Sequence, residues 1–115
     1  MRLKDKIIII TGGSGLIGKA ILKKIDEESG IALNVDINVR TDFSKREVYC
    51  DITQSNSIDE MLAQVLSKYG RIDGLVNNGY PRTKDWGNKF EEVTIESWRT
   101  NVDMQLNSVF YLCQK

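Results

Sequence analysis

The sequence has no histidine among its 115 residues, one proline, Pro81, and only two cysteines, Cys50 and Cys113. The lack of histidine excludes a Ser-His-Asp catalytic triad and the common histidine-containing metal sites. The two cysteines lie far apart in apolar runs, without the spacing of a metal or redox motif, so we expect both to be buried thiols in a reducing compartment. No metal site is predicted.

Net charge is also missing, because 16 Lys and Arg residues balance 16 Asp and Glu residues. The basic residues are scattered rather than gathered in a stripe, so neither nucleic acid nor a membrane surface is an expected partner. The apolar run nearest the N-terminus, residues 7–10, is too short for a signal peptide or a membrane span. We therefore expect a cytoplasmic protein whose partner is a small-molecule substrate or another protein subunit.

Short apolar runs alternate along the chain with segments whose apolar residues recur at three- and four-residue steps. Such runs are typical of strands buried on both faces of a parallel sheet, and such steps are typical of helices packed on it. Strands are expected at residues 7–10, 31–36, 48–50 and 72–77, and helices at residues 16–28, 55–69 and 94–110. The order predicts one α/β domain over residues 1–115, a three-layer Rossmann-like, doubly wound parallel sheet with right-handed crossovers.

Capping residues predict where these helices begin and end. Gly30 is expected to stop the first helix. Ser55 or Ser57 is expected to cap the start of the second helix, and Gly70 to end it. Thr94 is expected to cap the last helical region.

A glycine-rich loop, Thr-Gly-Gly-Ser-Gly-Leu-Ile-Gly over residues 11–18, joins the first strand to the first helix. Backbone N–H groups and the positive end of the helix dipole at such a junction suit a dinucleotide pyrophosphate, although the glycines also fit an ordinary turn. Gly12 would allow the turn, Gly15 would leave room for the pyrophosphate, and Gly18 would let the helix pack closely. The predicted pyrophosphate-binding residues are Gly12, Ser14, Gly15, Leu16, Ile17 and Gly18.

Asp36 ends the second strand eighteen residues after Gly18. This is close to the spacing at which a carboxylate accepts hydrogen bonds from the adenosine ribose hydroxyls. The same charge would repel a 2′-phosphate, so NAD is the expected cofactor and NADP is disfavoured. Two alternatives stay open: Asp36 could simply start a turn, and Arg40 nearby could turn toward a phosphate.

Together with these motifs, the sequence resembles the short-chain dehydrogenase/reductase family over its whole length. Residues 73–80, Asp-Gly-Leu-Val-Asn-Asn-Gly-Tyr, are similar to the Asp-x-Leu-Val-Asn-Asn-Ala-Gly of the family's fourth strand, and residues 49–53 resemble the end of its third. The resemblance implies the strand order 3-2-1-4, contacts of Asp51 and Ile52 with the adenine, and Asn78 and Gly79 beside the adenosine half of the cofactor. Residues 77–82 most resemble the flagellin-modification oxidoreductases.

Three features of the sequence depart from the family pattern. The glycine spacing is that of the extended, nucleotide-sugar branch, whereas the two asparagines belong to the single-domain branch. Tyr80 stands where the family has glycine, and it either shapes substrate access or fills the loop. Gln105 stands where many members have a catalytic Asn, so the resemblance makes it the catalytic candidate of this chain while leaving the family's proton relay in doubt.

In the family, a Tyr with a Lys four residues later acts as the general acid/base, and a Ser steadies the substrate oxygen. We expect these residues beyond position 115, so the chain is expected to be the N-terminal part of the domain and inactive alone. The matches Tyr80 to Lys84 and Tyr111 to Lys115 are interpreted as chance. Pro81 disfavours helical geometry in the first, and the second lies about 240° round a helix from Gln105.

The expected function is hydride transfer between NAD and a hydroxyl or keto group of a sugar-like metabolite. The alternatives are a non-catalytic dinucleotide-binding or interaction module, and an epimerase or dehydratase acting on a nucleotide sugar. In the family's strand order the fourth strand would be left on an open edge, and the last helix would present an apolar face that meets a second subunit in the family. A homo-oligomer through either element is therefore expected.

Overall fold

The computed structural model describes residues 2–115, in which four strands form one parallel sheet with the order β3-β2-β1-β4. Ile9 at the centre of β1 pairs with Leu33 on one side and with Leu75 on the other. The strands are β1 (Ile7–Thr11), β2 (Ile31–Asp36), β3 (Glu47–Tyr49) and β4 (Gly74–Val76). The predicted strand order is therefore confirmed, and β4 lies at the edge of the sheet.

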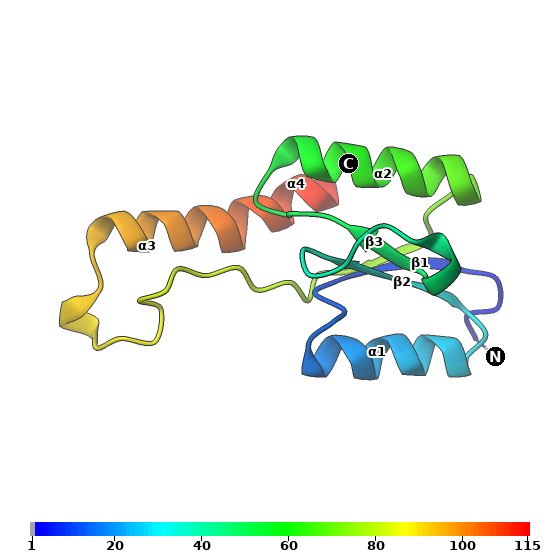
Figure 1. Cartoon of the computed structure of the whole chain (residues 1–115), viewed down its shortest axis with the longest axis horizontal. Helices are drawn as coiled ribbons and strands as arrows, with labels where there is room; N and C mark the ends of the chain where they lie inside the picture. The colour runs from blue at the N-terminus through cyan, green and yellow to red at the C-terminus, as the bar shows by residue number, and fades with distance from the viewer. Residues whose placement is uncertain (1) are drawn as a thin grey trace.

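Helices cover both faces of this sheet and make the three predicted layers. Figure 1 shows α1 (Leu16–Glu27) on one face and α2 (Ser55–Tyr69) with α4 (Ser108–Gln114) on the other. A short 3-10 turn, Phe43–Lys45, is the only helical structure between β2 and β3. The Rossmann-like α/β class is confirmed.

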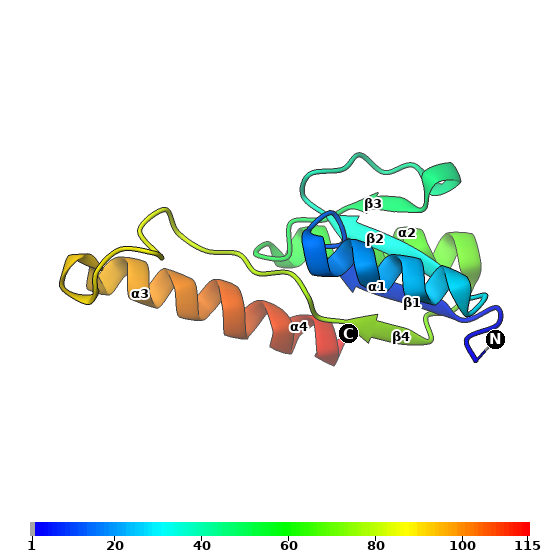
Figure 2. The same cartoon turned by 90° about the horizontal axis from the view of Figure 1, so that it is seen from below.

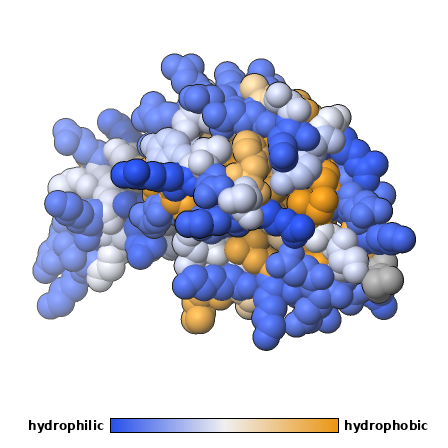
Figure 3. All heavy atoms as spheres, turned by 45° about the vertical axis from the view of Figure 1, so that its right-hand side comes forward, coloured by the Kyte–Doolittle hydropathy of each residue, from blue (hydrophilic) through white to orange (hydrophobic). Residues whose placement is uncertain are grey.

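The core divides into two clusters because successive side chains of a strand point to opposite faces. In β1, Ile7 and Ile9 pack toward α2 and α4, while Ile8 and Ile10 pack toward α1. Figure 3 shows hydrophobic side chains at the surface in patches across the middle of the body and at its lower edge, among hydrophilic ones. Burial on both faces explains why the strand reads as an unbroken run of isoleucines.

Two expected capping residues are wrong, although both helices begin and end within one residue of the expected positions. The left-handed residue after α1 is Ser29, with φ of 66°, and not Gly30. Gly30 is needed for packing instead, since a Cβ there would lie 2.7 Å from Cγ2 of Ile25. Neither serine caps α2, whose N-cap residue is Gln54; the Ser57 hydroxyl instead accepts a hydrogen bond from the Asp51 N–H at 2.9 Å.

The other two expected capping residues are confirmed. Gly70 ends α2 in the left-handed conformation, with φ of 79°. The Thr94 hydroxyl accepts a hydrogen bond from the Ser97 N–H at 3.0 Å at the start of α3 (Ile95–Val102).

The last helical region is one rod rather than a helix packed along the sheet. It runs from α3 through a π-helical turn, Asp103–Asn107, into α4, and Figure 2 shows α3 extending well beyond the sheet. A loop with a short 3-10 turn, Phe90–Glu92, connects β4 to this rod. Within the described residues, no helix is long and apolar enough to cross a membrane.

Candidate functional site

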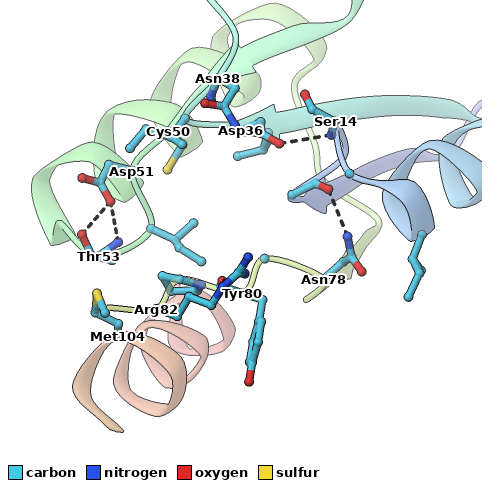
Figure 4. Close-up of a pocket in the computed structure, with 18 of the residues that line it drawn as sticks. Ser14, Asp36, Asn38, Cys50, Asp51, Thr53, Asn78, Tyr80, Arg82 and Met104 are labelled. Atoms are coloured by element: carbon cyan, nitrogen blue, oxygen red, sulfur yellow. Dashed lines mark hydrogen bonds between the residues drawn. The ribbon is translucent and has the colours of Figure 1, made fainter. Parts of the chain in front are cut away.

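A groove of about 850 Å3 opens at the carboxyl ends of the four strands. Ligands of open α/β sheets bind at this end, where the strand order reverses. Figure 4 shows side chains from the β1–α1 loop, the ends of β2 and β3, the segment after β4 and the rod surrounding one hollow. The predicted residues that line it are Gly12, Ser14, Gly15, Leu16, Ile17, Asp36, Asp51, Ile52, Asn78 and Gly79.

Three of the four glycines of the loop, Gly12, Gly15 and Gly18, have different surroundings. Gly12 has φ of 66°, which favours glycine. A Cβ on Gly15 would meet only the Gly12 carbonyl oxygen, at 3.5 Å, so the space beside Gly15 is open groove. A Cβ on Gly18 would lie 2.3 Å from the same oxygen, so glycine lets the helix pack closely against the loop at this position, which is not part of the groove lining.

Asp36 is buried at the end of β2, and both of its carboxylate oxygens accept backbone hydrogen bonds. Oδ2 accepts from the Ser14 N–H at 3.1 Å, and Oδ1 accepts from the Asn38 N–H at 2.9 Å. Asp36 therefore starts a turn and also lines the groove, so the two interpretations of this residue are compatible. Arg40 is exposed and is not part of the groove lining.

Asn34 supports the glycine loop from below, which the sequence pattern did not indicate. Its Nδ2 donates to the Ser14 hydroxyl oxygen at 3.0 Å. Its Oδ1 is buried without a hydrogen-bond partner in the described part of the chain. A Cβ on Gly13 would lie 2.4 Å from that Oδ1, so Gly13 allows the loop to lie directly on Asn34.

The segment after β3 forms the opposite wall of the groove. Oδ1 of Asp51 accepts hydrogen bonds from the N–H of Thr53 at 3.0 Å and from its hydroxyl at 2.6 Å, which fixes the turn into α2. Cys50 is buried in this wall, and burial raises the pKa of its thiol. The expectation that Cys113 is also buried is wrong, because α4 leaves that side chain on its exposed surface.

Thr11 joins the ends of β1 and β4, a role that the sequence analysis missed. Its hydroxyl oxygen accepts from the N–H groups of Asn78 at 3.0 Å and Gly79 at 2.9 Å. Nδ2 of Asn78 in turn donates to the Gly12 carbonyl oxygen at 3.0 Å. A hydroxyl residue directly before a glycine loop was the available signal, since such a side chain can cap neighbouring backbone groups.

The groove is closed on the side of the rod by four lining residues, Tyr80, Pro81, Arg82 and Met104 (Figure 4). The Tyr80 ring lies edge-on to Trp86, with 5.8 Å between the ring centroids. Sequence reasoning singled out Tyr80 but missed Arg82 and Met104, because neither belongs to a recognisable motif.

Gln105 does not line the groove, although it follows the lining residue Met104 in the π-helical turn. Its Nε2 is buried without a hydrogen-bond partner among the described residues.

The Tyr111 hydroxyl donates to Oδ1 of Asp59 on α2 at 2.7 Å, and this hydrogen bond raises the pKa of Tyr111. Residues 2–115 contain no cluster of three His, Cys, Asp or Glu side chains that could hold a metal ion.

Comparison with known proteins gives a consistent result. The family model described as short chain dehydrogenase matches residues 6–115. The post-translational flagellin modification protein A of Campylobacter coli is 34% identical, over 98% of this chain and 49% of its own length. The 2,5-dichloro-2,5-cyclohexadiene-1,4-diol dehydrogenase of Sphingobium indicum is 31% identical, over 98% of this chain and 47% of its own. The chain thus spans about half the length of the curated relatives it matches.

Solved structures share the fold. The ligand-free aldohexose dehydrogenase of Thermoplasma acidophilum superposes with a TM-score of 0.83 at 26% identity, covering 98% of this chain and 43% of that protein. A short chain dehydrogenase of Leptospira borgpetersenii with bound NAD+ has a TM-score of 0.78 at 28% identity, covering 97% of this chain and 44% of that protein.

Proposed function

Because the chain belongs to the short chain dehydrogenase family, we propose that it supplies the NAD-binding half of an oxidoreductase acting on a hydroxyl or keto group of a sugar-like metabolite. The observation that carries the proposal is the groove, in which the glycine loop and Asp36 face one hollow. The family is one of oxidoreductases. The substrate and the preference for NAD are the parts that we propose.

The groove fits a nicotinamide dinucleotide. The open space beside Gly15, at the start of α1, is where a pyrophosphate can approach backbone N–H groups and the positive end of the helix dipole. Asp51, Ile52 and the end of β3 form a wall that suits an adenine, with Asn78 and Gly79 across the hollow. When bound, the cofactor supplies the hydride chemistry, and the residues of this chain bind and orient it.

The preference for NAD rests on Asp36. A buried carboxylate facing the groove can accept hydrogen bonds from ribose hydroxyls, and it repels a 2′-phosphate. The relative with bound NAD+ is in accord with this preference. Arg40, the residue that could have favoured NADP, is exposed outside the groove lining.

A sugar-like substrate is supported by relatives only. The fold neighbour of Thermoplasma acidophilum is an aldohexose dehydrogenase, and a Rhizobium meliloti protein named as a probable galactose dehydrogenase is 26% identical. Among residues 2–115, no lysine is hydrogen-bonded to the hydroxyl of Tyr80 or Tyr111. Nζ of Lys115 lies 5.4 Å from the centroid of the Tyr111 ring, but the Tyr111 hydroxyl bonds Asp59. We propose that the acid/base residues lie outside this chain, which is then inactive alone.

A second candidate, a non-catalytic dinucleotide-binding module, is favoured by Gln105. The side chain at the position of the family's catalytic Asn lies outside the groove lining. Both candidates require nucleotide binding, and only the first requires NAD reduction by the complete protein with a sugar substrate. An activity screen of the complete protein with aldohexoses separates them.

Nucleotide binding is tested by Gly15→Val. The valine side chain would occupy the space that the pyrophosphate needs. Overpacking of this kind costs about 1–3 kcal/mol, which corresponds to about a ten- to hundredfold weaker affinity for NAD. The fold should persist, because a Cβ there meets only one atom within 4 Å and φ is −78°. Isothermal titration with NAD and thermal melting measure the two effects.

Gly87→Val is the matched control, since a Cβ on Gly87 meets nothing within 4 Å and Gly87 lies outside the groove. It should leave the affinity for NAD unchanged. Equal affinities of the wild type and the Gly15→Val variant would show that the glycine loop is only a turn.

A further inference from the structure

Arg82 is the only Lys or Arg among the residues that line the groove. Two carboxylates, Asp36 and Asp51, line it as well, but no carboxylate of residues 2–115 lies within ion-pair distance of Arg82. A guanidinium that faces a ligand groove without a counter-charge is available for a negatively charged group of a ligand.

The side chain of Arg82 is exposed and lies against Tyr80. Its guanidinium carbon lies 5.7 Å from the centroid of the Tyr80 ring, within the range of a cation–π contact. Nη1 also donates to the Tyr80 carbonyl oxygen at 3.4 Å, and the Tyr80 ring rests edge-on against Trp86. A guanidinium has five N–H donors, and the bond to Tyr80 is its only one within the described chain. The other donors remain for a ligand.

The backbone that carries Arg82 is anchored on both sides. Thr83 donates its N–H to Oδ1 of Asn101 at 2.9 Å, and Nδ2 of Asn101 donates to the Thr83 hydroxyl at 2.8 Å. Asn101 is fully buried, so this link fixes the loop to α3. Pro81 restricts the backbone on the other side. A backbone segment already fixed in this way loses less entropy when a ligand binds.

We propose that Arg82 is an anion-binding residue of the groove that takes a phosphate or carboxylate group of a bound ligand. The planar fork of arginine suits such groups because it can donate two parallel hydrogen bonds to them. The inference rests on the proposed function, which makes the groove a nucleotide site. The anionic group belongs either to the cofactor, as its diphosphate, or to the substrate.

The test compares Arg82→Gln with Lys84→Gln, which removes an exposed charge of the same loop outside the groove lining. Isothermal titration gives the affinities for NAD, ADP-ribose and adenosine. Sodium phosphate is then titrated into the NAD-saturated protein against sodium chloride of equal ionic strength. The fluorescence of Trp86 reports phosphate binding in a Trp98→Phe background, because Trp86 contacts the ring that holds Arg82.

Loss of hydrogen bonds to a charged group should weaken the affected ligand about ten- to a hundredfold. Weaker binding of NAD and ADP-ribose, with unchanged binding of adenosine, assigns Arg82 to the diphosphate. Unchanged binding of NAD, with loss of the phosphate response, assigns it to a substrate group. Lys84→Gln should change neither, and Arg82→Lys, which keeps the charge without the fork, should restore part of the loss.

The inference is overturned if Arg82→Gln changes neither response, or if Lys84→Gln produces the same losses. Thermal melting identifies a variant that is unfolded, in which case Arg82→Lys alone is compared with the wild type. A wild-type chain that does not bind NAD rejects the proposed function instead. The phosphate titration of the nucleotide-free protein then decides the role of Arg82.

Discussion

Asp36 connects the cofactor preference to the shape of the glycine loop. The carboxylate faces the groove, yet it also accepts the Ser14 N–H and so fixes the loop that would bind the pyrophosphate. Replacing Asp36 with alanine would therefore remove a charge and a structural acceptor together. Asparagine removes the charge and keeps one amide oxygen as an acceptor, so it loses only one of the two backbone hydrogen bonds and is the sharper variant.

Asp36→Asn should narrow the difference in affinity between NAD and NADP. The binding of NAD weakens by about tenfold for one lost charge-assisted hydrogen bond of about 1.5 kcal/mol, while NADP gains because the repulsion of its 2′-phosphate is removed. Isothermal titration of both cofactors measures the ratio. Equal affinities of the unmutated protein for NAD and NADP would contradict the role given to Asp36.

Several residues of the site could be predicted from the sequence, and others could not. The spacing of Gly12, Gly15 and Gly18 has a local cause, the geometry of a strand–loop–helix junction, so it is visible in the chain order. Arg82 and Asn34 gain their positions from contacts with residues distant in sequence, such as the link between Thr83 and Asn101. No local pattern carries that information.

At the scale of elements, Asp73 attaches β4 to β1. Its Oδ2 accepts from the Ile7 N–H at 2.8 Å, and its own N–H donates to the Ile7 carbonyl oxygen at 2.8 Å, one residue before the strand pairing begins at Gly74. The hydrogen bond from Ile7, together with the positive charge of Arg71, lowers the pKa of Asp73. The short edge strand is thus extended by a side chain.

A lowered pKa makes this contribution to stability dependent on pH. The stabilisation by Asp73 is complete above the unfolded pKa of an aspartate, about 3.9, and it is lost as the pH falls through the lower folded value. Asp73→Asn should therefore lower the free energy of unfolding at pH 7, and its difference from the wild type should shrink below about pH 4. Urea denaturation at several pH values measures this.

Glu60→Gln, which removes an exposed carboxylate of α2, is the control and should leave the pH dependence unchanged. A difference in the free energy of unfolding between wild type and Asp73→Asn that stays constant down to pH 2 would contradict the assignment.

The start of α2 is an element boundary whose capping residue could not be predicted from the sequence. Two serines suggested a cap, but the Ser57 hydroxyl bonds the Asp51 N–H of the groove wall, a choice made by tertiary contact.

At the scale of the whole molecule, the rod of α3 and α4 leaves much apolar surface uncovered. Trp98, Leu106 and Phe110 on it are each more than half exposed. Leaving such surface in water is unfavourable by about 25 cal/mol per Å2 relative to burying it. The edge strand β4 is the other surface open to pairing.

We predict a dimer or larger assembly built on the rod or on β4. Phe110→Glu should shift the chain toward the monomer if the rod is the interface. Phe90→Glu changes an even more exposed ring outside the rod and should have no effect. Light scattering at tens of micromolar measures the mass. A wild-type monomer with a sharp cooperative melt would contradict the prediction, and a dimer that survives Phe110→Glu would point to β4.

The link between Thr11 and the segment after β4 has a consequence for folding. The N–H groups of Asn78 and Gly79 reach Thr11 across more than sixty residues of chain, and closing a loop of that length is slow compared with forming the β1–α1–β2 unit. This closure forms the wall of the groove that contains Asn78 and Gly79, so a nucleotide that contacts this wall selects chains whose edge strand is already in place. At a ligand concentration of 100 times Kd, such linkage adds about 2.7 kcal/mol to the stability of the whole sheet.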